Sequence, residues 1–158
     1  MLIATDLDGT LLTTDGTISP RTRDVIDAAE RAGVPVVPVT ARQIYGIERW
    51  QDDLGRWALC SNGAICWDLQ AHTVLFRQLM SATVANEFAH RLLAVAPGIR
   101  FLTIKDDGLT FASQRGYAEL TTFADHSRDP SEMPALDLDE VLDGDCLKMR
   151  SEERRVGK

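Results

Sequence analysis

The sequence begins MLIATDLDGT over residues 1–10, and this stretch predicts how the fold begins. Residues 1–5 form a short apolar run, which is followed by Asp6, Asp8 and Gly9. A short apolar run bounded by turn residues is typical of a buried strand that ends in a loop. We therefore expect the chain to open with a strand that carries two acidic side chains just beyond its carboxyl end.

Strands and helices are expected to alternate after this first strand. A helix over residues 19–33 begins with the capping pair Ser-Pro and ends at a glycine. Strands are expected over residues 34–39 and 57–60, with a second helix over residues 41–53. Short connections between alternating elements predict an α/β fold with a doubly wound parallel sheet, whose ligands bind outside the carboxyl ends of the strands. The first helix is expected to bury Val25, Ile26, Ala29 and Ala32.

A different pattern of elements follows. Turn residues between short apolar runs predict hairpins around residues 11–18, 64–76 and 99–112. One further strand is expected over residues 145–149. A helix over residues 81–95 is expected to bury one face, formed by Val84, Phe88, Leu92 and Val95. This α+β pattern predicts that a second module begins near Leu79.

Composition and charge exclude several classes of protein. The 158 residues include 17 Lys and Arg against 24 Asp and Glu, which gives a formal net charge of −7. The basic residues are scattered, and this argues against a nucleic-acid partner, because phosphate backbones attract basic patches. No apolar run is long enough to span a bilayer, and acidic residues interrupt the place where a signal peptide needs an apolar stretch. We expect a cytoplasmic protein that binds neither nucleic acid nor a membrane.

Asp6 and Asp8 are the residues that point to a chemistry. Two carboxylates this close repel each other unless a cation lies between them, and Mg²⁺ typically uses one or two carboxylates together with water and substrate phosphate. Asp6 is a candidate nucleophile that attacks phosphorus, and Asp8 a candidate general acid and base. Gly9 permits the tight turn that follows. The alternative is that both carboxylates are solvated loop acids, which are common.

The motif Asp6-x-Asp8-Gly9-Thr10 after an apolar strand resembles the first signature of the haloacid dehalogenase-like hydrolase superfamily. Val39-Thr40-Ala41-Arg42 is similar to its second signature, and Ser61-Asn62-Gly63-Ala64 resembles a turn of its Cof-type phosphatase branch. Taken alone, Thr40 would more often cap a helix, and Asn62-Gly63 is otherwise an ordinary turn. The resemblance implies a Mg²⁺-dependent phosphatase in which both aspartates bind the metal. It also implies a group of phosphate-binding or substrate-binding residues: Gly9, Thr10, Thr40, Arg42, Asn62 and Gly63.

The resemblance also implies how the chain is divided. Residues 1–78 correspond to the N-terminal part of a Rossmann-like hydrolase core, and residues 79–149 to the first part of an α+β cap that selects the substrate.

Residues 150–158 resemble the translation of a sequencing adapter, so we expect them to be non-native and to complete no element.

Two features of the family are missing from this sequence. The family needs a lysine that stabilises the phosphoryl charge, and a Gly-Asp-x-x-Asn-Asp cluster that completes the Mg²⁺ shell. Gly144-Asp145 lacks the acidic pair, and Lys148 lies in an expected cap strand. We therefore expect an incomplete core with an exposed apolar sheet edge and weak or no activity.

Three functions remain open at this point. The first is hydrolysis of a small phosphorylated metabolite, such as a sugar phosphate, through an aspartyl-phosphate. The second is a receiver-like phospho-acceptor domain, although that fold places its acceptor Asp after the third strand, where this chain has Cys60-Ser61-Asn62. The third is a phosphosugar mutase or transferase that uses the same aspartate pair.

Overall fold

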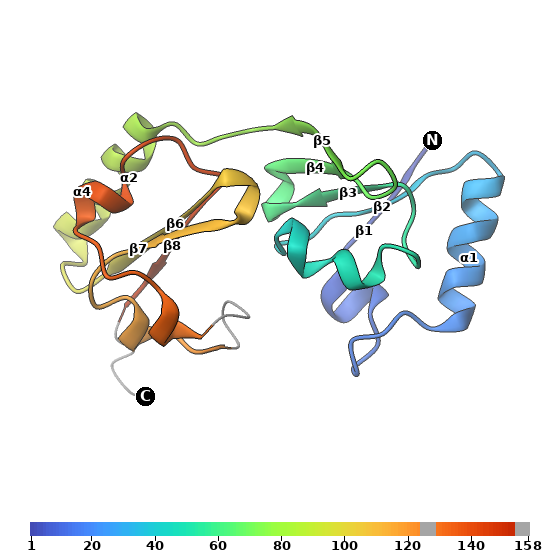
Figure 1. Cartoon of the computed structure of the whole chain (residues 1–158), viewed down its shortest axis with the longest axis horizontal. Helices are drawn as coiled ribbons and strands as arrows, with labels where there is room; N and C mark the ends of the chain where they lie inside the picture. Colours follow the sequence, from blue (N-terminus) through green and yellow to red (C-terminus); the bar gives the residue numbers. More distant parts are fainter. Residues whose placement is uncertain (124–128, 154–158) are drawn as a thin grey trace. The chain divides into compact units, whose positions relative to one another are not determined.

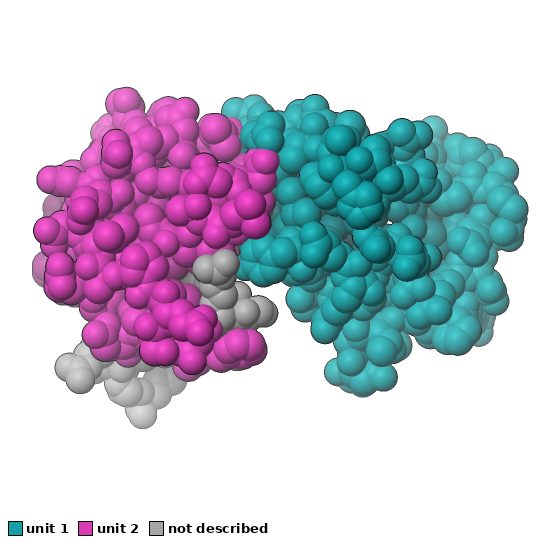
Figure 2. Space-filling model, viewed as in Figure 1, with its two compact units in different colours: residues 1–78 teal, residues 79–158 magenta. Residues whose placement is uncertain are grey.

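The computed structural model describes residues 1–123 and 129–153. The chain divides into two compact units, Met1–Gln78 and Leu79–Lys158, which are shown in different colours in Figure 2. Each unit is described by itself below. Among the described residues, no helix combines the length and apolar character that a membrane span requires.

The first unit is built on a β-α-β crossover (Figure 1). Strand β1 (Ile3–Thr5) pairs in parallel with β2 (Val36–Pro38), and helix α1 (Pro20–Arg31) connects them. A parallel pair needs such a crossover, because a tight turn cannot join its strands. The hydroxyl of Ser19 accepts a hydrogen bond from the backbone N–H of Thr22 (3.1 Å), so the predicted helix start is confirmed.

The parallel sheet is smaller than the sequence predicts. Strand β3 (Trp57–Cys60) joins β2 through a single parallel bridge between Val39 and Leu59. It then pairs antiparallel with β4 (Ile65–Asp68), which pairs in turn with β5 (Thr73–Arg77). The fold is α/β, but the described residues form small sheets rather than a clear doubly wound sheet.

The predicted helix over residues 41–53 is wrong. Two 3₁₀ turns, Ile44–Gly46 and Glu48–Trp50, occupy this segment. The carbonyl oxygens of Thr40 and Arg42 accept hydrogen bonds from the backbone N–H groups of Asn62 (3.0 Å) and Ser61 (2.8 Å). These carbonyls therefore accept hydrogen bonds from a distant loop instead of from the N–H groups of an α-helix. Gly46 disfavours a helix further.

Two further expectations for the first unit need correction. Residues 11–18 form a turn rather than a hairpin of strands, with the N–H of Thr13 donating to the carbonyl of Thr17 (2.9 Å). On α1, Ile26 is buried, but Val25 is 62% exposed and Ala32 is also exposed. The sheet that α1 covers is narrow, so a narrower stripe of the helix packs than the sequence pattern predicts.

The second unit is an antiparallel sheet packed against helices. Strands β6 (Arg100–Lys105), β7 (Thr110–Ser113) and β8 (Lys148–Glu152) lie in the order β7-β6-β8. Helices α2 (Ala82–Val95) and α4 (Leu138–Val141) contribute to the core of this unit. That core consists of Ala85, Ala89, Ile99, Phe101, Val141 and Leu142. The predicted hairpins of β4-β5 and β6-β7 are confirmed.

The face that α2 buries differs from the predicted one. Ala85 and Ala89 are buried, whereas Val84, Phe88 and Val95 are 53% to 78% exposed. Leu92 is partly buried against the core. Alanine lets the helix backbone approach the sheet closely, which larger side chains at these positions would prevent.

The last strand also lies further along the chain than predicted. Residues 148–152 form β8, where a strand over residues 145–149 was expected. Arg150, Ser151 and Glu152 pair with Leu102, Phe101 and Arg100, so the expectation that residues 150–158 complete no element is wrong for these three. Strand pairing uses backbone groups and therefore needs no apolar pattern in the sequence. Residues 154–158 lie outside the described residues, and the non-native origin of the tail stays a prediction.

Candidate active site

Asp6 and Asp8 lie directly after β1 and flank a buried leucine. Leu7 is 0% exposed, while Asp6 and Asp8 are both exposed. The buried Leu7 therefore anchors the turn and leaves the two acidic side chains outside the core. Gly9 has a φ of +75°, and the N–H of Leu12 donates to the carbonyl of Leu7 (2.9 Å). Because that φ favours glycine, Gly9 permits the turn that follows the acidic pair.

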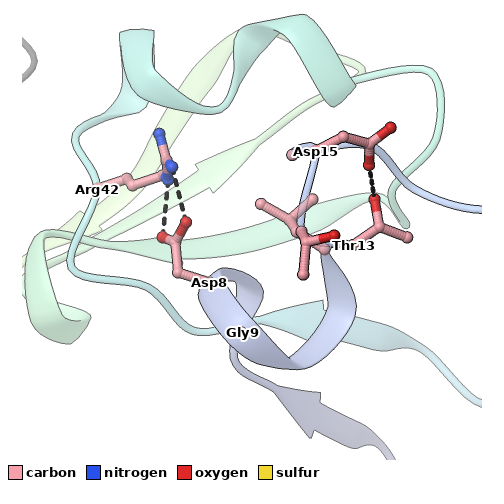
Figure 3. Close-up of a pocket in the computed structure, with 8 residues that line it drawn as sticks. Asp8, Gly9, Thr13, Asp15 and Arg42 are labelled. Carbon is pink, nitrogen blue, oxygen red and sulfur yellow. Dashed lines mark hydrogen bonds and ion pairs between the residues drawn. The ribbon is translucent and has the colours of Figure 1, made fainter.

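The carboxylate of Asp8 forms a two-point contact with the guanidinium of Arg42 (Figure 3). Arg42 Nε donates to Asp8 Oδ2 (2.8 Å), and Arg42 Nη2 donates to Asp8 Oδ1 (2.7 Å). These bonds hold the pKa of Asp8 below its ordinary value; the charges of Arg42 and Arg49 add to the effect, and partial burial opposes it. The pairing brings together residues that are 34 positions apart and follow different strands.

Thr40 and Arg42 are held in a local turn at the end of β2. Thr40 is buried, and its hydroxyl accepts a hydrogen bond from the backbone N–H of Arg42 (3.1 Å). The backbone N–H of Thr40 donates to the carbonyl of Leu59 (2.8 Å), which ties this turn to β3. The bond to Arg42 is the local type that a capping threonine makes, so the hydroxyl is already engaged with the backbone.

The turn at Ser61, Asn62 and Gly63 has a left-handed backbone. The three φ angles are +54°, +60° and +87°, of which only the last belongs to glycine. Such a conformation is costly for Ser and Asn, and persists where the surroundings hold it. Here the hydrogen bonds to the carbonyls of Thr40 and Arg42 hold it. The turn therefore places the exposed Asn62 next to the Thr40–Arg42 segment.

The structure also brings in residues that sequence reasoning missed. Gln43 and Ser61 are both buried, and the hydroxyl of Ser61 donates to Gln43 Oε1. This buried pair connects the two loops that follow β2 and β3. No motif in the sequence signals it, because the partners are 18 positions apart and each residue type is common in loops.

Trp50 is a second missed residue. It is buried, and its indole N–H donates to the carbonyl of Gly16 (3.0 Å). Arg42 and Arg49 both approach its ring. An aromatic residue at helical spacing predicts only a core position, so the sequence carries no signal for this role.

A cavity of about 610 Å³ lies beside the Asp8–Arg42 pair. Its volume is within the range of sites for small ligands. Asp15 is one of the residues that line this cavity. The hydroxyls of Thr13 and Thr17 donate to its carboxylate, and these bonds hold the pKa of Asp15 below its ordinary value. The cavity is lined by Asp8, Gly9, Leu12, Thr13, Thr14, Asp15, Gly16 and Arg42.

The residues present fit a magnesium ion to a limited extent. Among the described residues, no group of three or more His, Cys, Asp or Glu side chains is placed to hold a metal ion. Asp6 nevertheless offers an exposed carboxylate that makes no capping bond to the following turn. Mg²⁺ accepts one or two carboxylates when water and phosphate complete its shell. Asp6 meets that need, while the carboxylate of Asp8 is engaged by Arg42.

The remaining predicted site residues are less closely connected. Thr10 is exposed, and Gly63 contributes a left-handed backbone position. Asp8 and Arg42 are in contact, and the Thr40–Arg42 and Ser61–Gly63 segments are joined by backbone hydrogen bonds. The roles assigned to these residues stay predictions.

Comparison with known proteins identifies the family. The family model of haloacid dehalogenase-like hydrolases matches residues 3–145. Pyridoxal phosphate phosphatase YbhA of Escherichia coli is 30% identical over 135 residues, which cover 84% of this chain and 49% of that protein. The 5-amino-6-(5-phospho-D-ribitylamino)uracil phosphatase YwtE of Bacillus subtilis is 34% identical over 107 residues, which cover 68% of this chain and 36% of that protein.

The fold is similar to that of solved structures in the same family. The HAD subclass IIB sugar phosphatase BT4131 superposes with a TM-score of 0.69 at 17% identity, over 94% of this chain and 56% of that one. The chain thus spans about half the length of the proteins it matches, or less. It belongs to the haloacid dehalogenase-like hydrolase family.

Proposed function

We propose that the whole protein is a Mg²⁺-dependent phosphomonoesterase that acts on a small phosphorylated metabolite, with a sugar phosphate as the expected substrate. One observation carries this proposal: Asp6 and Asp8 are exposed at the end of β1, and Asp8 is paired with Arg42 from the end of the next strand. The names of similar proteins support this proposal. Two relatives are named as phosphatases of pyridoxal phosphate and of a phosphorylated uracil derivative, and a protein of similar fold is named as a sugar phosphatase.

Asp6 is the proposed nucleophile. One of its carboxylate oxygens attacks phosphorus, the bond from phosphorus to the ester oxygen breaks, and an aspartyl-phosphate forms. Asp8 donates a proton to the departing oxygen, so the leaving group departs as an alcohol. Water then attacks the phosphorus of the aspartyl-phosphate and gives a proton to Asp8. This step breaks the bond between phosphorus and Asp6, releases phosphate and restores both carboxyl groups. Asp6 would hold a Mg²⁺ ion, with Asp8 as the second predicted ligand when Arg42 releases it, and the ion would supply positive charge that stabilises the phosphoryl oxygens.

Arg42 influences the proton chemistry of Asp8. The ion pair lowers the pKa of Asp8 and so opposes the protonated form that the first step requires. A phosphate dianion offers Arg42 a competing acceptor with the geometry that a guanidinium prefers. Substrate binding would therefore draw Arg42 away from Asp8 and allow that carboxyl group to carry a proton. Thr40, Asn62 and the backbone at Gly9, Thr10 and Gly63 are the proposed contacts to the other phosphoryl oxygens.

The test uses the complete protein with the substitution Asp6→Asn. We expect hydrolysis of phosphomonoesters to fall by about 10⁴-fold or more, as for the loss of other nucleophiles, and the trapped phosphoenzyme to disappear. Asp24→Asn makes the same change at an exposed position of α1 and should leave turnover unchanged. Turnover retained in Asp6→Asn would exclude this mechanism. Release of free phosphate separates a hydrolase from a mutase or transferase, which would return the phosphate on another position or acceptor.

A further inference from the structure

A second arginine lies beside the Asp8–Arg42 pair. The guanidinium carbon of Arg49 is 4.0 Å from the ring centroid of Trp50, and that of Arg42 is 5.1 Å from the same centroid. Trp50 is buried and held by its hydrogen bond to the carbonyl of Gly16. The ring is therefore a fixed platform that keeps both guanidinium groups in one neighbourhood.

The two arginines differ in how their charge is balanced. Arg42 is neutralised by the two-point contact with Asp8. Arg49 is exposed, and within residues 1–123 and 129–153 no acidic side chain forms an ion pair with it. A guanidinium stacked on a ring keeps the N–H donors in its own plane free, and these donors match carboxylate and phosphate groups. Arg49 therefore has the capacity to bind an anion.

Gly16 connects Arg49 to the cavity. A Cβ atom at Gly16 would lie 3.5 Å from Nη2 of Arg49, and Gly16 lines the same cavity as Asp8 and Arg42. Arg49 thus lies next to Gly16, one of the residues that line the cavity beside the Asp8–Arg42 pair.

We propose that Arg49 is a specificity residue that binds a second anionic group, located on the leaving-group side of the substrate. The site would then favour phosphate esters whose leaving group carries a carboxylate or another phosphate over esters with an uncharged leaving group. This inference rests on the proposed function, because Asp6 and Asp8 position the phosphoryl group whose leaving group reaches Arg49.

Calorimetric titration of the 158-residue chain in the presence of Mg²⁺ tests the proposal with two matched pairs of probes. The first pair is 3-phosphoglycerate and glycerol 3-phosphate, and the second is fructose 1,6-bisphosphate and fructose 6-phosphate. In at least one pair, we expect the probe with two anionic groups to bind on the order of tenfold more tightly than the probe with one, which is the effect of one charge-assisted contact. The pair that shows the preference tells whether the second group is a carboxylate or a phosphate.

Three variants give the result its meaning. Arg49→Gln should remove the preference within the pair while leaving the affinity for the probe with a single phosphate group unchanged. Arg49→Lys should retain only part of the preference, because lysine keeps the charge but loses the planar fork. Arg21→Gln removes the same charge from an exposed position of α1 and should change nothing. Equal affinities within both pairs, or a preference that survives Arg49→Gln, would overturn this inference alone. Failure of the unmodified chain to bind any of the four esters would also overturn this inference, whereas the proposed function is decided separately by Asp6→Asn in the complete protein.

Discussion

At the scale of residues, the ion pair between Asp8 and Arg42 has a direct effect on the ionisation of Asp8. Its pKa is held below the ordinary value of 3.8, chiefly by the hydrogen bonds from Arg42. A carboxyl group with a lowered pKa stabilises the folded state above its ordinary pKa, and this contribution is lost as the pH falls through the lowered value. The pair is partly exposed, with 55% of the Asp8 side chain accessible, so solvent screening limits its contribution.

A double-mutant cycle with Arg42→Gln and Asp8→Asn measures this contribution. We expect a coupling free energy of about 1 kcal/mol or less at pH 7, because exposed pairs give values in that range. At an acidic pH below the ordinary value of 3.8, where Asp8 accepts its proton, the coupling should decline. Urea unfolding of the four proteins at both pH values gives the result. A coupling that stays constant or grows as the pH falls would contradict the assigned ion pair.

At the scale of elements, helix α2 shows how a face is selected. Val84, Phe88 and Val95 form an apolar stripe at helical spacing, yet they are exposed, and the side packed on the sheet carries Ala85 and Ala89. The spacing of large apolar residues therefore identifies the helix but not its buried side. The close approach that alanine allows is what determines the packing.

Substitutions on the two sides of α2 should have different effects. Ala89→Leu places a larger side chain in a fully packed position and should lower the free energy of unfolding by about 1 to 3 kcal/mol. Phe88→Gln alters an exposed position and should change it by about 0.5 kcal/mol or less. Denaturant unfolding of both variants compares the two faces. If Phe88→Gln proved the more damaging substitution, the observed packing of α2 would be wrong.

At the scale of the whole molecule, the free edge of β1 is the feature with the widest consequence. Among the described strands, β1 pairs with β2 only, and Leu2 and Ile3 are 59% and 45% exposed. An unpaired strand edge with apolar side chains is a template for pairing with another chain. The sequence-based expectation of an exposed apolar sheet edge agrees with this arrangement.

Self-association of the 158-residue chain should therefore depend on β1. Ile3→Lys places a charge on this edge and should shift the chain toward the monomer in sedimentation velocity experiments at increasing concentration. Val25→Lys makes the same change at an exposed position of α1 and should not alter the association. If the two variants associate to the same extent as the unmodified chain, β1 is not the contact.

Local sequence patterns are enough to predict the β-α-β crossover, the cap of α1, the hairpins of β4-β5 and β6-β7, and the position of Asp6 and Asp8 directly after the first strand. These features depend on local chemistry, such as an apolar run, a capping serine or a turn glycine, and neighbouring residues are enough to specify them. Their positions in the chain can therefore be predicted without knowledge of the tertiary structure.

Long-range packing determines which groups meet and which faces are buried. Arg42 reaches Asp8 across 34 positions, Ser61 binds Gln43 across 18, and the carbonyls of Thr40 and Arg42 are used by a distant turn instead of by a helix. Likewise, β8 forms where β6 offers its backbone, and α2 turns its alanines to the sheet. Each outcome depends on a partner that is far away in the chain. The local sequence does not specify that partner, because the two segments meet only when the chain folds.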